Sequence, residues 1–126
     1  MGFKFYNANP EHHRIGDCVI RAISALTGKS WDEVYKDLSM EGFRRRDMPN
    51  ANNVWGAYLR GLGYTREIVP DTCQDCYTVA DFAQDHPDGK YLLALNQHVV
   101  AVDSGCWLDT WDSGNETVMY FWRKDE

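Results

Sequence analysis

The stretch DCVIRAISALTG, residues 17–28, decides how the first part of the chain folds. Asp17 is a residue type that favours the N-cap of a helix, and Gly28 is one that favours its end. The apolar residues that recur between them at the i, i+3, i+4, i+7 spacing of one helix face are Val19, Ala22, Ile23 and Leu26. We therefore predict an amphipathic helix from Cys18 to about Thr27, with a thiol on its first residue.

The position of Cys18 has a chemical consequence. A helix N-terminus concentrates unpaired N–H groups and the positive end of the helix dipole, and both stabilise a thiolate. The other interpretation is that Cys18 is a small buried hydrophobic residue, as most free cysteines are. The helix alone does not decide between a nucleophile and a core residue.

Several further segments before residue 90 have the pattern of regular structure. Ser30 and Glu33 form a capping box at the start of a second helix, which we expect to end near Leu38. The remaining predicted elements of this part are a helix over 53–62, a short strand over 64–69 and a short helix over 79–86 that Thr78 caps.

The character of the chain changes after the turn at Pro87-Asp-Gly. Four β-rich runs follow, each bounded by turn residues: KYLLALN (90–96), HVVAVD (98–103), CWLDTW (106–111) and TVMYFW (117–122). We expect them to form antiparallel strands joined by short hairpins. The prediction is an α+β fold, with N-terminal helices packed on a C-terminal antiparallel sheet in a single domain, residues 1–126.

Composition and charge narrow the classes of function. The chain has 126 residues, a length that is enough for one domain with a core but too short for two domains. Of these residues, 44% are hydrophobic. A net charge of −6 argues against nucleic acid as a partner, and Arg44–Arg46 is interpreted as a solvated turn. No apolar run approaches the ~20 residues of a membrane span, and the first ten residues lack the apolar segment of a signal peptide. We expect a cytoplasmic protein with no membrane partner.

Cys73 and Cys76 have the C-x-x-C spacing of zinc and redox sites, but this spacing occurs only once. A zinc site needs two more ligands, and neither Cys106 nor His86 stands at a recognisable second spacing. We predict a loop with reduced thiols, no metal and no cofactor. A metal-binding module that uses Cys73 and Cys76 is the third-ranked alternative.

His98 opens a strongly apolar run and is therefore a candidate partner for Cys18. Thiol catalysis needs a thiolate, a histidine within hydrogen-bond reach, and a polar group that orients the histidine. Two aspartates in the next run could be that group. A three-residue turn after Val102 would bring Asp112 to the face of His98, whereas a two-residue Ser-Gly turn would bring Asp109. Serine is disfavoured at the positive φ of the shorter turn, so we expect Asp112.

Two segments give the chain a resemblance to a known family. GDCVIRAISALTGKSWDEVYKDL (16–38) and LALNQHVVAVDSGCWLDTWDSG (93–114) resemble the papain-like cysteine peptidase superfamily. They are most similar to its compact bacterial and phage members and to the peptidase domain of bacteriocin-processing transporters. The resemblance implies a papain-like fold in which Cys18 is the nucleophile, His98 the base and Asp112 the residue that orients it.

The chain departs from that family at one functional position. The family often places Gln six residues before the cysteine, as the side-chain donor of the oxyanion hole, and position 12 here is His. The resemblance implies that His12 takes this role, with His13, Asn9 and Asn7 as alternatives. The backbone N–H of Cys18 is the expected second donor.

The sequence therefore predicts a thiol-dependent hydrolase, a cysteine peptidase or an amidase or acyl transferase, that acts on a peptide or protein substrate. The alternative is a non-catalytic papain-like module for binding or host interaction, in which the Cys-His pair is vestigial. Fold alone does not separate the two, because function resides in the site.

Overall fold

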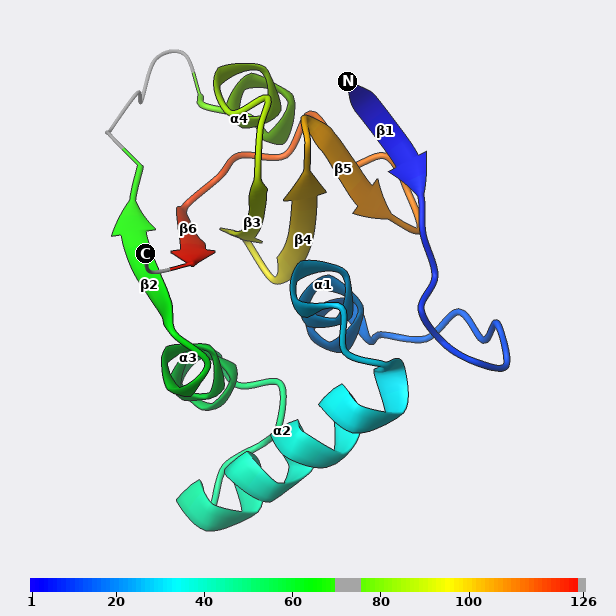
Figure 1. The fold of residues 1–126 in the computed structure, drawn as a ribbon, viewed down its shortest axis with the longest axis vertical. Coiled ribbons are helices and arrows are strands. Elements are labelled where there is room, and N and C mark those ends of the chain that lie inside the picture. Colours follow the sequence, from blue (N-terminus) through cyan, green and yellow to red (C-terminus); the bar gives the residue numbers. More distant parts are fainter. Residues whose placement is uncertain (70–75, 125–126) are drawn as a thin grey trace.

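A computed structural model describes residues 1–69 and 76–124 of the chain, and these residues form an α+β fold built on a mixed sheet (Figure 1). The helices and strands, in chain order, are β1 (Gly2–Phe5), α1 (Cys18–Thr27), α2 (Trp31–Arg45), α3 (Asn52–Gly61), β2 (Tyr64–Ile68), α4 (Val79–Asp85), β3 (Lys90–Leu95), β4 (His98–Asp103), β5 (Cys106–Asp109) and β6 (Tyr120–Lys124). The predicted α1, α3, α4 and β2 are confirmed to within a residue.

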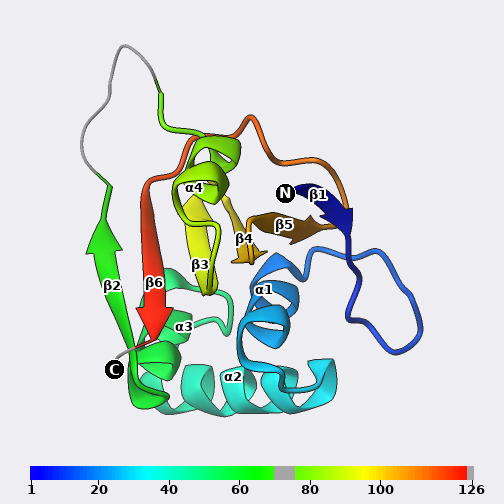
Figure 2. The same cartoon turned by 45° about the horizontal axis from the view of Figure 1, so that its top comes forward.

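The sheet is larger and less regular than the predicted run of hairpins. Its strand order is β1-β5-β4-β3-β6-β2, with β1 parallel to β5 and every other neighbouring pair antiparallel. The expectation that β5 and β6 form a hairpin is wrong. Residues 110–119 instead carry the chain past the sheet, so that β6 lies between β3 and β2 (Figure 2). The N-terminal segment adds the edge strand β1, which no periodicity in the sequence indicated.

Side-chain alternation along β3 and β4 divides the interior into two cores. Leu92 and Ala94 on β3 face α1, α2 and α3, whereas Leu93 and Leu95 face α4. Figures 1 and 2 show α4 on the opposite side of the sheet from the other helices. Because both faces are covered, these strands are apolar on both sides, which explains their nearly continuous hydrophobic runs.

Helix α2 does not end near Leu38, as the sequence suggested, but continues to Arg45. Gly42 lies inside it and is buried, and a Cβ at that position would meet the Asp47 carbonyl oxygen at 2.7 Å. The helix ends where Arg46 adopts a left-handed conformation with φ 55°. The arginine cluster is exposed, as expected, but Arg44 and Arg45 lie in the last turn of the helix and Arg46 is its C-cap.

Among residues 1–69 and 76–124, no helix combines the length and the apolar character needed to cross a membrane.

Candidate active site

The N-terminus of α1 holds Cys18, and Asp17 precedes it at the N-cap position. The Asp17 side chain does not cap the helix, contrary to the sequence-based expectation. Its two oxygens accept hydrogen bonds from Arg21 Nη1 at 2.7 Å and from Trp31 Nε1 at 2.9 Å. The carboxylate is thus turned away from the first-turn N–H groups, which stay uncapped beside the thiol.

Cys18, His98 and Val99 line the same cleft, and His98 and the Val99 backbone are the groups that stabilise the Cys18 thiolate by hydrogen bonding. Burial of the thiol acts to raise its pKa. The hydrogen bonds from His98 and Val99, together with the positive charges of His98 and Arg21, outweigh burial and lower the pKa of Cys18 below its ordinary value. The contact therefore favours a thiolate–imidazolium ion pair.

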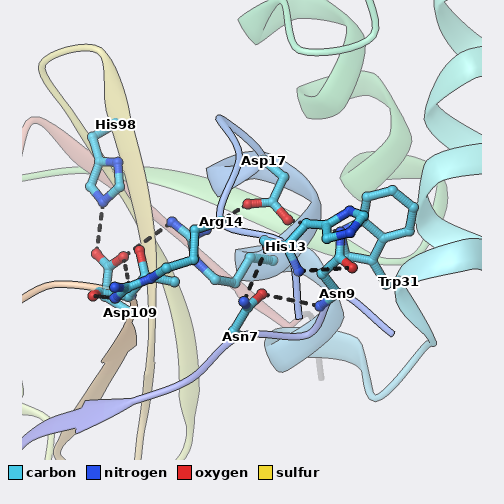
Figure 3. Close-up of polar contacts among 10 residues, drawn as sticks. Asn7, Asn9, His13, Arg14, Asp17, Trp31, His98 and Asp109 are labelled. Carbon is cyan, nitrogen blue, oxygen red and sulfur yellow. Dashed lines mark hydrogen bonds and ion pairs between the residues drawn. The ribbon is translucent and has the colours of Figure 1, made fainter. Parts of the chain in front are cut away.

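His98 is held on its other side by a carboxylate. Its Nε2 lies 2.7 Å from Asp109 Oδ2 (Figure 3), which leaves Nδ1 for the Cys18 sulfur. Burial acts to lower the pKa of His98, but the hydrogen bonds and charges of Asp109 and Cys18 raise it to about 9. The indole of Trp111 packs on the imidazole with ring centres 4.9 Å apart. The imidazole ring is thus held at Nε2 by the Asp109 carboxylate and on one face by the Trp111 indole.

Asp109 is fully buried at the end of β5 and receives four hydrogen bonds. Oδ2 accepts from His98 and from Ser113 Oγ at 2.8 Å, and Oδ1 accepts from the Thr110 N–H at 2.7 Å and from Arg21 Nη2 at 3.1 Å. Burial acts to raise the pKa of Asp109, but the contacts with His98, Ser113 and Thr110 lower it overall. Asp109 is therefore an ionised, immobile partner for His98.

The prediction that Asp112 orients His98 is wrong, and the reason is the turn between β4 and β5. Asp103 pairs with Cys106, so the turn has two residues, Ser104 and Gly105, both with positive φ. Serine is tolerated there because its N–H donates to the Gly89 carbonyl at 2.9 Å, a contact outside the hairpin. This shorter turn is the alternative that brings Asp109 to His98.

Asp112 has a different role. Its Oδ1 accepts hydrogen bonds from Trp107 Nε1 at 2.8 Å and from the Gly114 N–H at 3.0 Å. These contacts fold the chain that follows β5 over the Trp107 ring. Asp112 is therefore a structural residue of this loop.

The two aspartates can be separated by experiment. Asp109→Asn should lower the pKa of His98 from about 9 toward the ~6.5 of a free histidine, because the ring loses its anionic partner. Asp112→Asn is the matched control and should leave the His98 pKa unchanged. The measurement is an NMR titration of the imidazole protons. An equal fall in both variants would contradict the assignment.

Arg21 is the residue that sequence reasoning missed. Its side chain, 5% exposed, forms ion pairs with both Asp17 and Asp109, at 2.7 Å and 3.1 Å, and so joins the helix that bears Cys18 to the strand that bears Asp109. One signal was present in the sequence: an arginine four residues after Asp17, within a run of apolar helical residues.

The structure does not bring His12 to Cys18. His12 is exposed in the loop between β1 and α1, adopts φ 59°, and does not line the cleft beside Cys18. The alternatives Asn7 and Asn9 bond the backbone of their own loop: Asn7 Nδ2 donates to the His13 carbonyl (Figure 3), and Asn9 Oδ1 accepts from the Glu11 N–H. The sequence-based assignment of the oxyanion donor is therefore not supported.

A cleft of about 460 Å³ opens beside Cys18 and His98. Its other walls come from the segment before α3, the turn between β3 and β4, and Met119 just before β6. The thiol therefore faces a space large enough for a small ligand or a short chain segment.

Only the second cysteine of the C-x-x-C segment lies among the described residues. Cys73 lies outside the described residues, and Cys76 is an exposed free thiol. Among the residues that the structure describes, no three His, Cys, Asp or Glu side chains are grouped so that they could hold a metal ion. The reduced, metal-free loop stays a prediction.

Comparisons of the chain with protein-family models, with curated proteins and with solved structures give no match.

Proposed function

We propose that this protein is a thiol-dependent hydrolase or acyl transferase that acts on an amide bond. The observation that carries the proposal is that Cys18 and His98 line one cleft, while His98 is held at 2.7 Å by the buried carboxylate of Asp109. A nucleophile, a proton carrier and a buried carboxylate in this order are the three parts that thiol catalysis needs. The resemblance to papain-like cysteine peptidases supports the same roles for Cys18 and His98, with Asp109 in place of Asp112.

The first half of the reaction forms an acyl-enzyme. The Cys18 thiolate attacks the amide carbonyl carbon, and the negative charge moves to the carbonyl oxygen. The uncapped N–H of Cys18 at the start of α1 is the expected donor to that oxygen. As the C–N bond breaks, His98 gives its Nδ1 proton to the leaving nitrogen, and a thioester remains on Cys18.

The second half releases the acyl group. His98, now neutral, takes a proton from water or from an acceptor amine or alcohol, whose oxygen or nitrogen attacks the thioester carbonyl. The C–S bond breaks and Cys18 leaves as the thiolate. Asp109 stays ionised throughout, because its role is to orient the imidazole and to stabilise its positive charge.

A labelling and cleavage experiment tests the proposal. Iodoacetamide at pH 6 should alkylate Cys18 faster than Cys76 or Cys106, because the Cys18 thiolate is stabilised by His98. A peptide library incubated with the protein should give new termini that are absent with Cys18→Ala. Mass spectrometry reads both results. Slow labelling of Cys18 together with an uncut library would contradict the proposal.

One observation favours the second candidate, a non-catalytic binding module. His12 does not replace the Gln that the family uses beside the oxyanion, so this side-chain donor is missing from its expected place. Loss of one such donor reduces the rate of known enzymes by about 10²–10³-fold. Rapid labelling of Cys18 with no cleavage of the library would favour the module.

A further inference from the structure

The described residues that line the cleft beside Cys18 include no permanently charged side chain. Its lining residues are Cys18, Val19, Asn50, Asn52, Trp55, Ala94, Leu95, Asn96, Gln97, His98, Val99 and Met119. None of these described residues is Asp, Glu, Lys or Arg, although these four types make up 25% of the chain. Among residues 1–69 and 76–124, the only ionisable groups that line the cleft are thus those of Cys18 and His98.

Four of the lining residues carry carboxamides, and they come from two separate segments. Asn50 and Asn52 lie at the start of α3, and Asn96 and Gln97 form the turn between β3 and β4; all four are exposed. Each carboxamide offers donors as well as acceptors, which is the pattern that a peptide backbone also presents. Asn52 Oδ1 already accepts a hydrogen bond from Trp55 Nε1 at 3.1 Å. The amide nitrogen of Asn52 is therefore the group that can donate to a ligand.

Gln97 is placed at this cleft by an unusual backbone conformation. Its φ is 58°, in the left-handed region that residues other than glycine rarely adopt. The residue directly precedes His98 and pairs no strand, because Leu95 and His98 close the hairpin. The turn therefore carries two carboxamides next to the reacting histidine.

The rest of the cleft wall is apolar. Trp55 and Leu95 line it and are buried in the two cores, whereas Met119 lies at its edge and is 57% exposed. An uncharged side chain can pack on this wall. A charged side chain would lose part of its hydration there and find no opposite charge, which is unfavourable.

We propose that the cleft binds an uncharged peptide segment and presents its scissile carbonyl to Cys18. The carboxamides hydrogen-bond the backbone of the segment, and the apolar wall receives its neutral side chains. A volume of about 460 Å³ suits a segment of drug-like size, the equivalent of a short peptide. This inference rests on the proposed function, because it names the substrate class of the same site.

The test uses three peptide vinyl sulfones that differ at one side chain: acetyl-Ala-Gln-Gly, acetyl-Ala-Glu-Gly and acetyl-Ala-Lys-Gly vinyl sulfone. Each labels a thiolate by forming a C–S bond to the vinyl carbon, after which the resulting carbanion takes a proton. The labelling rate of Cys18 is read by mass spectrometry and divided by its iodoacetamide rate. We expect the Gln probe to exceed both charged probes by about tenfold or more.

The Lys probe separates the cleft from the overall charge of the protein. A net charge of −6 alone would attract Lys and repel Glu, so fastest labelling by the Lys probe would overturn the inference. Equal rates for all three probes would also overturn it. If iodoacetamide labelling of Cys18 is slow and the peptide library stays uncut, the proposed function falls and this inference falls with it. Fast iodoacetamide labelling without discrimination among probes removes this inference alone.

A pair of variants locates the selectivity. Asn50→Asp places a negative charge in the cleft and should raise the Lys-probe rate relative to the Gln-probe rate severalfold. Asn53→Asp adds the same charge to the exposed first turn of α3, outside the cleft lining, and should leave that ratio unchanged. Equal changes in both variants would assign the effect to general electrostatics and overturn the inference.

Discussion

Replacing His98 with alanine is expected to reduce the alkylation rate of Cys18 at pH 6 by roughly two orders of magnitude, because a thiol with a pKa of ~8.5 is almost wholly protonated there. In the native protein the imidazolium donates a hydrogen bond to the sulfur and adds a positive charge beside it. Alanine removes both, so burial dominates and the pKa of Cys18 rises. The measurement is a series of iodoacetamide rates from pH 5 to pH 10, read at each cysteine by mass spectrometry.

His86→Ala is the control for this variant. It removes an imidazole of the same size from the opposite face of the sheet, where the ring stacks on Phe82 with centres 3.8 Å apart. The Cys18 rate should stay at the native value in this variant, provided that circular dichroism shows both proteins folded. An unchanged Cys18 rate in His98→Ala would show that the two residues are not a catalytic pair.

The pH dependence of alkylation and of hydrolysis should differ at the alkaline end. His98 has a pKa of about 9, so it is protonated below that pH and neutral above it. Alkylation needs only the thiolate and should not fall above pH 9. Hydrolysis also needs the imidazolium proton for the leaving nitrogen, so its rate should fall as pH rises through about 9. Because Cys18 and His98 interact, the apparent pKa values from both pH profiles belong to the pair rather than to either residue alone.

Local sequence patterns were sufficient to place Cys18 at the start of α1 and His98 at the start of β4. The apolar face of α1, its boundary at Cys18 and its end at Gly28 all depend on residues within one short segment, and the structure confirms them. The same holds for His98, which follows a two-residue turn after an apolar strand. These features need no information about distant parts of the chain.

The residue that orients His98 could not be predicted from the same kind of pattern. The choice between Asp109 and Asp112 depends on whether Ser104 accepts a positive φ, and intrinsic preference argues against it. The Ser104 N–H donates to the carbonyl of Gly89, the residue just before β3, and this tertiary contact holds the turn. The free-energy cost of serine at a positive φ is small enough to be outweighed by one hydrogen bond.

The strand order of the sheet also could not be predicted from local patterns, because it depends on pairing between distant segments. Strand β1 joins the edge beside β5, and β6 crosses to lie between β3 and β2. The placement of β1 depends on contacts between residues about a hundred positions apart in the chain. The placement of β6 depends on contacts between residues dozens of positions apart. The α+β class follows from local periodicity, whereas the strand order does not.

Arg21→Met is expected to lower the free energy of unfolding by about 3–5 kcal/mol, the usual result of removing one member of a buried ion pair. The Arg21 side chain is 5% exposed, and those of Asp17 and Asp109 are 3% and 0% exposed. Methionine fills a similar space but leaves two buried carboxylates without the guanidinium between them. Asp17 would keep the Trp31 indole as a donor, and Asp109 would keep His98, Ser113 and the Thr110 N–H.

The measurement is urea unfolding at pH 6. The raised pKa of His98 contributes stability that is complete below about 6.5 and is lost as pH rises through about 9, so pH 6 lies outside that window. Arg44→Met is the matched control, because Arg44 is 62% exposed and its ion pair with Glu41 lies at the surface. That change should lower stability by less than about 1 kcal/mol.

Arg21→Lys tests whether the planar fork of the guanidinium is what joins α1 to β5. One ammonium group cannot reproduce the two contacts in the same geometry, so this variant should lie between the native protein and Arg21→Met in stability. The site should respond as well: a looser Asp109 holds the imidazole less firmly, and the alkylation of Cys18 at pH 6 should slow in both variants. A loss of stability with unchanged Cys18 reactivity would make Arg21 a structural residue alone. Unchanged stability in Arg21→Met would show that the buried ion pairs do not hold the helix of Cys18 to the strand of Asp109.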